Sequence, residues 1–172
     1  CGMGRAGRFF THEWAGVTPD IVAVAKGIGG GFPLGACLAS EKAAASMDSG
    51  SHGSTYGGNP LAMAAGNAVL DILLGDGFFD HVATMGTLLR ERLNDLTTCH
   101  RGIVTDVRGL GLMLGLECAV PNRDLMTKLR GNGLLTLTAG DHVLRMLPPL
   151  VIEESHVDEA MEILEKTCRE WE

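Results

Sequence analysis

An apolar run that ends in a lysine and is followed by glycines constrains this chain more than any other feature. Residues 21–25 read Ile-Val-Ala-Val-Ala, Lys26 follows, and four of the next five residues are glycine. The apolar run predicts a buried strand, and the glycines predict a turn whose backbone can be approached closely. Lysine is rare at fully buried positions, because its ammonium group must be desolvated. The pattern therefore predicts a single amine where the strand meets the turn.

Two explanations of Lys26 follow from this pattern. Burial and neighbouring groups can activate a lysine amine so that it attacks a carbonyl and forms a Schiff base, typically with pyridoxal phosphate. Alternatively, the side chain extends from the strand end into water, as isolated lysines commonly do. The glycines favour the first explanation, since they leave room for a flat ring beside the backbone.

A polar loop at residues 51–58 is the second feature that indicates chemistry. It places the hydroxyl groups of Ser54 and Thr55 among several backbone amides. Asn59-Pro60 then reads as the N-cap and first turn of a helix that runs to about Leu74. Amides, hydroxyl groups and a helix dipole all favour an anion. The loop is therefore a candidate phosphate site, and an ordinary surface turn is the alternative.

Together these motifs resemble the class III aminotransferases. The resemblance is carried by residues 16–36, which contain the lysine and the glycines, by residues 52–62, which contain the polar loop, and by Val107–Met113 and Val143–Leu150. Within that family the stretches are most similar to the members that act on acetylornithine. The resemblance covers nearly the whole chain, and the lysine block combined with the Ser-Thr loop is highly specific.

The resemblance implies roles for individual residues. Lys26 would be the catalytic residue and would bind pyridoxal 5′-phosphate, and Thr55 would bind the cofactor phosphate across the interface of a homodimer. Ser54 would contact the substrate, and Arg145 would hold the substrate's carboxylate through two hydrogen bonds. A strand-end arginine paired on the surface is the alternative for Arg145. No metal site is expected, because the six histidines show no ligand spacing.

The resemblance also implies a reaction: transamination of acetylornithine, or a related ω-amino compound, with 2-oxoglutarate, in arginine biosynthesis. Family members that act on ornithine, succinylornithine or 4-aminobutyrate share these motifs and remain alternatives. In the family, an Asp-Glu-Val-Gln segment, whose aspartate pairs with the pyridine nitrogen, stands just before the position of Cys1. We therefore expect the C-terminal part of an aminotransferase, either a fragment or a truncated reading frame, that is inactive alone. A non-catalytic truncated product is the further alternative.

The implied fold class is α/β, the C-terminal part of the type I pyridoxal-phosphate-dependent transferase fold. Residues 1–75 are expected to end the large cofactor-binding domain and residues 76–172 to form a small α+β domain, with the division at Gly75-Asp76-Gly77. In the first part the sequence predicts strands at 21–25 and 35–39 and helices at 41–47 and 60–74. In the second part it predicts helices at 79–96, 123–130 and from Ser155, and strands at 103–107, 112–117, 134–137 and 143–146.

Charge and composition disfavour several classes of partner. With 14 basic and 21 acidic residues the net charge is −7, which argues against a nucleic-acid partner. No apolar run approaches the roughly 18 residues of a membrane span. The five cysteines are odd in number and show no CxxC spacing, which favours a reducing cytoplasm over a disulfide framework.

The stretch Gly2–Gly7 matches a dinucleotide-binding fingerprint letter by letter. Such a fingerprint opens an apolar helix, whereas the residues that follow here are Arg-Phe-Phe-Thr-His. A nucleotide site is therefore not expected at this end of the chain.

Overall fold

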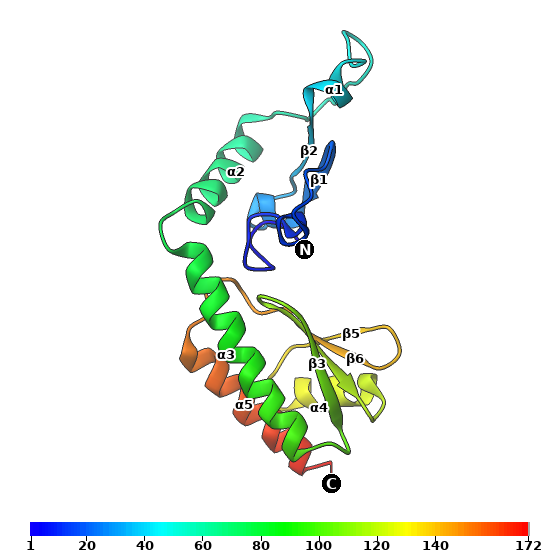
Figure 1. The fold of residues 1–172 in the computed structure, drawn as a ribbon, viewed down its shortest axis with the longest axis vertical. Helices are drawn as coiled ribbons and strands as arrows, with labels where there is room; N and C mark the ends of the chain where they lie inside the picture. Colours follow the sequence, from blue (N-terminus) through cyan, green and yellow to red (C-terminus); the bar gives the residue numbers. More distant parts are fainter. Residues whose placement is uncertain (172) are drawn as a thin grey trace. The chain divides into compact units, whose positions relative to one another are not determined.

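The computed structural model describes residues 1–171, and the chain divides into two compact units. Unit 1 comprises Cys1–Gly4 and Arg8–Phe78, whereas unit 2 comprises Arg5–Gly7 and the chain from Phe79 onward. In Figure 1 unit 1 runs in colour from blue to blue-green, and unit 2 runs from green to red apart from its blue segment Arg5–Gly7.

Unit 1 is built on a two-stranded antiparallel sheet. Strand β1 (Ile21–Ala25) pairs with β2 (Gly35–Ala39), so that Ile21 faces Ala39 and Ala25 faces Gly35. The remaining elements are the 3-10 helices η1 (Thr11–Ala15) and η2 (Lys26–Gly29) and the helices α1 (Glu41–Ala44) and α2 (Pro60–Leu73). No residue of β1 or β2 is fully buried. The expectation of a buried strand at 21–25 is therefore wrong, because a ribbon of two strands covers too little of either one.

Helix α2 holds the glycine turn through residues that lack a side chain. Asn59 caps the helix with its side chain. A Cβ atom on Gly66 of α2 would lie 2.9 Å from Leu34 Cδ2, and a Cβ atom on Gly30 would lie 2.8 Å from Val69 Cγ2. Both distances are too short for a real side chain, so glycine at these positions permits the turn and the helix to approach closely.

Unit 2 is an antiparallel sheet packed with helices. Its strands, in the spatial order β3-β4-β6-β5, are β3 (Val104–Leu110), β4 (Met113–Cys118), β6 (Val143–Met146) and β5 (Leu137–Ala139), and its helices are α3 (Phe78–Cys99), α4 (Asn122–Gly131) and α5 (Glu154–Arg169). Figure 1 shows α3 and α5 running alongside each other next to the sheet. An ion pair of 3.5 Å between Arg92 and Asp158 joins these two helices.

The hydrophobic core lies in unit 2. All of the largest fully buried side chains belong to this unit: Leu89, Leu93, Leu112, Leu114, Leu116, Leu125, Leu129, Leu144, Leu164, Val82, Val104 and Val157. Across the sheet, Val107, Leu116 and Leu144 stand directly opposite one another and form a buried row. Side chains alternate along a strand, so their neighbours in sequence point to the other face of the sheet.

Arg5–Gly7 pack into the β3–β4 hairpin of unit 2. Leu112 N donates a hydrogen bond of 3.1 Å to Arg5 O. The Arg5 guanidinium donates in return to Leu112 O, at 3.2 Å, and to Pro148 O. Burial lowers the pKa of the Arg5 side chain. The residues of the dinucleotide fingerprint thus join a hairpin rather than open a helix, as expected from the residues that follow them.

The turn of this hairpin is enclosed on two sides. Gly111 has a φ of +53°, and a Cβ atom there would lie 2.6 Å from the carbonyl carbon of Ala6. On helix α3, a Cβ atom on Gly86 would lie 2.8 Å from the carbonyl carbon of Gly111. Backbone atoms therefore pack against the hairpin turn on both sides. Unlike the end of a side chain, these atoms cannot rotate away to make room for a Cβ atom.

The predicted helices and strands are confirmed, with ends that shift by up to three residues. Helix α3 continues to Cys99 instead of residue 96, and β3 continues to Leu110 instead of residue 107. Strand β5 begins at Leu137 instead of residue 134. Leu134 N donates to Leu129 O at 2.8 Å, so this segment closes the end of α4 before the strand can start. Helix α1 ends at Ala44 instead of residue 47.

Candidate active site

Lys26 is the first residue of η2 and directly follows β1, at the junction expected from the sequence. Its side chain is exposed, and its backbone is left-handed, with a φ of +57°. Residues other than glycine rarely adopt this conformation, which costs about 1–3 kcal/mol and persists where the surrounding structure enforces it. The packing of the glycine turn against α2 supplies that constraint, and the strain at Lys26 marks it as a candidate functional residue.

The loop that carries Ser54 and Thr55 is exposed and leads directly into α2. Ser54 Oγ accepts a hydrogen bond of 2.9 Å from Gly57 N. Asn59 Nδ2 donates to Tyr56 O, also at 2.9 Å. These two bonds fold the loop over the N-terminal end of the helix. Each hydroxyl group keeps a proton that it can donate to an anion.

Arg145 lies on β6 in unit 2, whereas Lys26, Ser54 and Thr55 lie in unit 1. The Nε atom of Arg145 is buried and has no hydrogen-bond partner among residues 1–171. A buried donor without a partner is costly, so this guanidinium is suited to an external acceptor such as a carboxylate.

The chemistry of these residues fits a cofactor with an aldehyde and a phosphate. Lys26 supplies a primary amine, Thr55 supplies a hydroxyl donor, and the N-terminal end of α2 supplies positive electrostatic potential. Arg145 adds a planar cation suited to a carboxylate. Within the described residues no hydrogen bond or ion pair joins Lys26 directly to Ser54 or Thr55.

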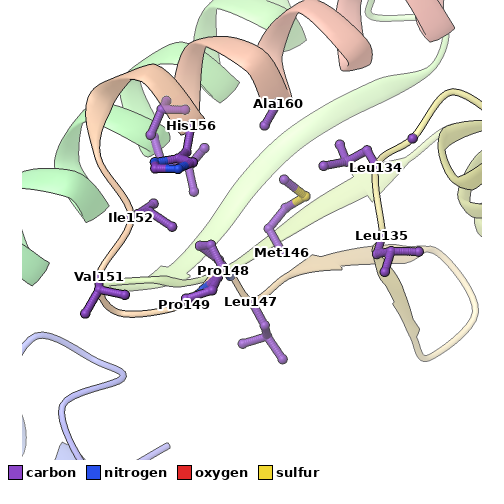
Figure 2. A pocket seen from close by; sticks show the side chains of 13 residues that line it. Leu134, Leu135, Met146, Leu147, Pro148, Pro149, Val151, Ile152, His156 and Ala160 are labelled. Atoms are coloured by element: carbon purple, nitrogen blue, oxygen red, sulfur yellow. The ribbon is translucent and has the colours of Figure 1, made fainter.

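A cavity of about 540 Å³ in unit 2 contains none of these four residues. Figure 2 shows its lining side chains, which come from the segment after α4, from the chain that follows β6 and from the start of α5. The lining is aliphatic except for His156, whose Nδ1 accepts a hydrogen bond of 3.0 Å from Glu153 N. Met146 lines the cavity, and its neighbour Arg145 points to the other face of the sheet. The cavity therefore lacks the groups that the proposed chemistry needs.

Other kinds of site find no support in the described part of the chain. No group of three or more His, Cys, Asp or Glu side chains among residues 1–171 could hold a metal ion. None of the cysteines there forms a disulfide bond, and burial raises the pKa of the Cys118 thiol, which disfavours the reactive thiolate. No single described helix is long and apolar enough to cross a membrane; α2 and α3 pass that test only when counted together.

The sequence alone did not single out two features of this region. Arg108 and Glu117 form an ion pair of 2.7 Å on the sheet that carries Arg145. In the sequence, Arg5 stands out only as part of the dinucleotide fingerprint. The sequence signal for both features is a glycine next to each arginine, at Arg108 and at Arg5. Such glycines mark tight turns, which bring distant segments together.

Comparison with known proteins extends over the whole described chain. A family model described as class-III aminotransferase matches residues 1–168. Acetylornithine aminotransferase of Mesorhizobium japonicum is 53% identical over 161 residues, which cover 94% of this chain and 40% of the relative. The protein of the same name from Rhodobacter capsulatus is 49% identical over 172 residues, which cover 100% of this chain and 44% of the relative. The chain thus spans well under half the length of these curated relatives.

Solved structures show the same fold. Acetylornithine aminotransferase from Elizabethkingia anophelis matches with a TM-score of 0.90 and 32% identity, over 98% of this chain and 43% of that chain. Ornithine aminotransferase from Plasmodium yoelii matches with a TM-score of 0.90 and 34% identity, over 99% of this chain and 46% of that chain.

Proposed function

We propose that this chain, which belongs to the class-III aminotransferase family, supplies the lysine, the phosphate-binding loop and a carboxylate-binding arginine of a pyridoxal-phosphate-dependent aminotransferase. The family resemblance and the fold class expected from the sequence are confirmed by the matches. The observation that carries the functional proposal is Lys26, a lysine held in a left-handed conformation between a strand and a glycine turn.

Lys26 has two tasks in this proposal. Its Nζ atom would hold the cofactor through the aldehyde carbon, whose oxygen would leave as water, and a primary amino group of the substrate would later take the place of Nζ. The released amine then takes a proton from the substrate carbon at Nζ and returns it as a general acid. When bound, pyridoxal phosphate supplies an electron sink for the carbanion that forms at that carbon. The side chain is exposed at the end of β1, so neither task is blocked by packing in unit 1.

In this proposal, three further side chains bind and orient the cofactor and the substrate: those of Thr55, Ser54 and Arg145. Thr55 Oγ1 donates a hydrogen bond to the cofactor phosphate, across the interface of a homodimer. Ser54 contacts the substrate with its hydroxyl proton while its oxygen continues to accept from Gly57 N. Arg145 binds the substrate's carboxylate, which would satisfy the buried Nε atom that has no partner in the described chain.

Acetylornithine and 2-oxoglutarate are the proposed substrates, in arginine biosynthesis, because two of the curated relatives compared above carry the name acetylornithine aminotransferase. Ornithine is the second candidate, favoured by the solved ornithine aminotransferase at 34% identity. The exposed apolar side chains of Tyr56, Leu61 and Ile72 support the proposed homodimer, since a second subunit could cover them. The proposed location is the cytoplasm, which suits cysteines that form no disulfide among the described residues.

Covalent trapping of the cofactor on Lys26 tests the proposal. Reduction of the full-length protein with borohydride in the presence of pyridoxal phosphate should attach the cofactor to Lys26, as mapped by peptide mass spectrometry. Lys26→Ala should abolish trapping and transamination, because no other group in the proposed site can form the covalent bond. Lys42→Ala, which removes an exposed lysine on α1, is the matched control and should change neither. Trapping on Lys128 or Lys166 instead would contradict the assignment.

A further inference from the structure

The ladder of hydrogen bonds between β4 and β6 ends one residue after Arg145. Its last pair is Leu114 with Met146. Strands that ran on in the same register would place Leu112 opposite Pro148. The end of the ladder therefore borders the proposed carboxylate-binding arginine along its own strand.

Proline at position 148 prevents this ladder from continuing. In an antiparallel pair of strands, every second pair of opposite residues exchanges two backbone hydrogen bonds. Cys118 N donates to His142 O at 2.7 Å, which sets the phase of this alternation. Three steps of two residues further along, Leu112 and Pro148 would form such a pair. Pro148 has no N–H group, so it cannot donate to Leu112 O. Figure 2 shows a second proline, Pro149, directly after it.

Arg5, which belongs to unit 2, supplies the hydrogen bonds that this pair lacks. Its Nη1 atom donates to Leu112 O at 3.2 Å and also to Pro148 O. Its carbonyl oxygen accepts from Leu112 N at 3.1 Å. Both carbonyl groups of the missing pair, and its one N–H group, thus bond to a single residue. Hydrogen bonds from a charged donor are stronger than those between neutral groups, so Arg5 closes the end of the ladder firmly.

A closed ladder matters for Arg145 because a guanidinium forms two hydrogen bonds with a carboxylate only in one relative orientation. Without Arg5 the ladder would end at Met146, and the carbonyl groups beyond it would lose their donor. Strand ends with unpaired backbone groups open more readily than paired segments. In molecules with an open end, the residue next to the last pair would no longer hold its guanidinium in the binding orientation.

We propose that Arg5 is a positioning residue that closes the β4–β6 ladder at Leu112 and Pro148, and so holds Arg145 in the arrangement that binds the carboxylate of a dicarboxylate ligand. This inference rests on the role of Arg145 in the proposed function. Arg5 acts through Arg145 and not by contact with the ligand. Without Arg5, the apparent dissociation constant of the ligand would rise by the inverse of the fraction of molecules in which the end of β6 stays closed.

Equilibrium binding of glutarate, a dicarboxylate without a reactive keto group, tests this role. Calorimetry on the full-length holoenzyme compares the unchanged sequence with Arg5→Gln. We expect Arg5→Gln to weaken glutarate binding by about fivefold or more, as when the end of β6 is closed in about a fifth of the molecules or fewer. Hydrogen exchange followed by mass spectrometry should be faster in the peptide that contains β6. Unchanged affinity would overturn the proposal.

Arg90→Gln is the matched control for a general loss of stability. Arg90 also donates from one guanidinium to two carbonyl groups of the β3–β4 hairpin, those of Val107, at 3.3 Å, and Gly109. These carbonyl groups lie on β3, which β4 separates from β6. Urea denaturation should show that both variants are destabilised, whereas glutarate binding should change by less than about twofold in Arg90→Gln. Equal weakening in both would show that Arg5 only stabilises the fold, which would overturn its positioning role.

Arg5→Lys provides a milder change if Arg5→Gln does not fold. Lysine keeps the charge, but its Nζ atom ends one bond short of the position of Nη1. Its loss of glutarate affinity should lie between those of the unchanged protein and Arg5→Gln, and so should its exchange rate at β6. An order of affinities that does not follow the order of exchange rates would contradict the proposal.

Salt dependence separates positioning from attraction at a distance. If the charge of Arg5 merely attracted the ligand, the weakening in Arg5→Gln would shrink as salt is added. A positioning effect should keep the same fold-change between about 0.05 M and about 0.5 M sodium chloride. A difference that disappears at high salt would overturn the proposal.

Arg145→Gln separates failure of this inference from failure of the proposed function. If it weakens glutarate binding and Arg5→Gln does not, Arg145 binds the carboxylate without help from Arg5, and only this inference fails. If Arg145→Gln has no effect, the carboxylate site assigned to Arg145 is wrong, and the role of Arg5 is overturned with it. Trapping of the cofactor on Lys26 does not depend on either outcome.

Discussion

At Lys26 the backbone and the side chain have opposite requirements. The left-handed φ of +57° favours glycine, whereas covalent chemistry needs an amine. Met3 is the other residue apart from glycine with a positive φ in the described chain. Alanine at position 26 would carry about the same backbone strain as lysine. Lys26→Ala therefore removes the amine without changing the stability of the turn, which makes its loss of activity interpretable.

Thr55 is predicted to contribute measurably to cofactor affinity. Thr55→Val removes a hydroxyl donor to a charged phosphate and should weaken pyridoxal phosphate binding by about 1–3 kcal/mol. The residue is exposed, so the variant should fold normally. Absorbance titration of the full-length protein measures the affinity. Ser51→Ala, which removes another exposed hydroxyl from the same loop, is the control. Equal affinities in Thr55→Val and the unchanged protein would exclude Thr55 as a phosphate ligand.

Lys26, Ser54 and Thr55 could be named from the sequence because each lies within a compact motif, whereas Arg145 was indicated only by the family resemblance. Lys26 is marked by the glycines that follow it. Ser54 and Thr55 are marked by the capped helix that follows them. The environment of Arg145 could not be predicted in the same way. Its unpaired Nε depends on the register of three strands, in which Gly115 separates it from Arg108. No local pattern encodes that register.

Among the elements, helix α3 is predicted to tolerate no side chain at Gly86. Gly86→Ala would place a Cβ atom 2.8 Å from backbone atoms of Gly111, which cannot rotate away. We expect a loss of about 1–3 kcal/mol in the free energy of unfolding. Gly131→Ala in α4 is the matched control, because nothing lies within 4 Å of its Cβ position.

The control should change stability in the opposite direction. Alanine is favoured over glycine in a helix by up to about 1 kcal/mol, so Gly131→Ala should be neutral or stabilising. Urea denaturation of both variants measures the difference. Two changes of the same sign and size would show that close packing at Gly86 does not limit stability.

The sequence predicts the elements well where turn residues and periodicity agree. Both β2 and β6 begin and end as predicted, since each is a short run between breakers that is apolar throughout in β2 and apolar apart from Arg145 in β6. Strand β5 is shorter than predicted because Leu134 is used to end α4. The exposure of β1 was missed because an apolar run reads the same in a wide sheet and in a two-stranded ribbon.

For the whole molecule, the distribution of the core predicts unequal stability in the 172-residue chain. The largest fully buried side chains all lie in unit 2, whereas β1 and β2 contain no fully buried residue. Hydrogen exchange followed by mass spectrometry should find the slowest amides in α3, β4 and α5, and fast exchange in β1 and β2. Equally slow exchange in β1 would contradict this distribution.

The position of Arg5–Gly7 has a consequence for the order of folding. Their hydrogen bonds to Leu112 and Pro148 join residues 107 and 143 positions apart. Residues 8–78 therefore form a loop. This loop closes only when Arg5–Gly7 bind to the β3–β4 hairpin. Closing so long a loop is entropically costly and slow, so local contacts within the later part of the chain form first. A chain emerging from the ribosome would hold Arg5–Gly7 without their partners until more than a hundred further residues had been made.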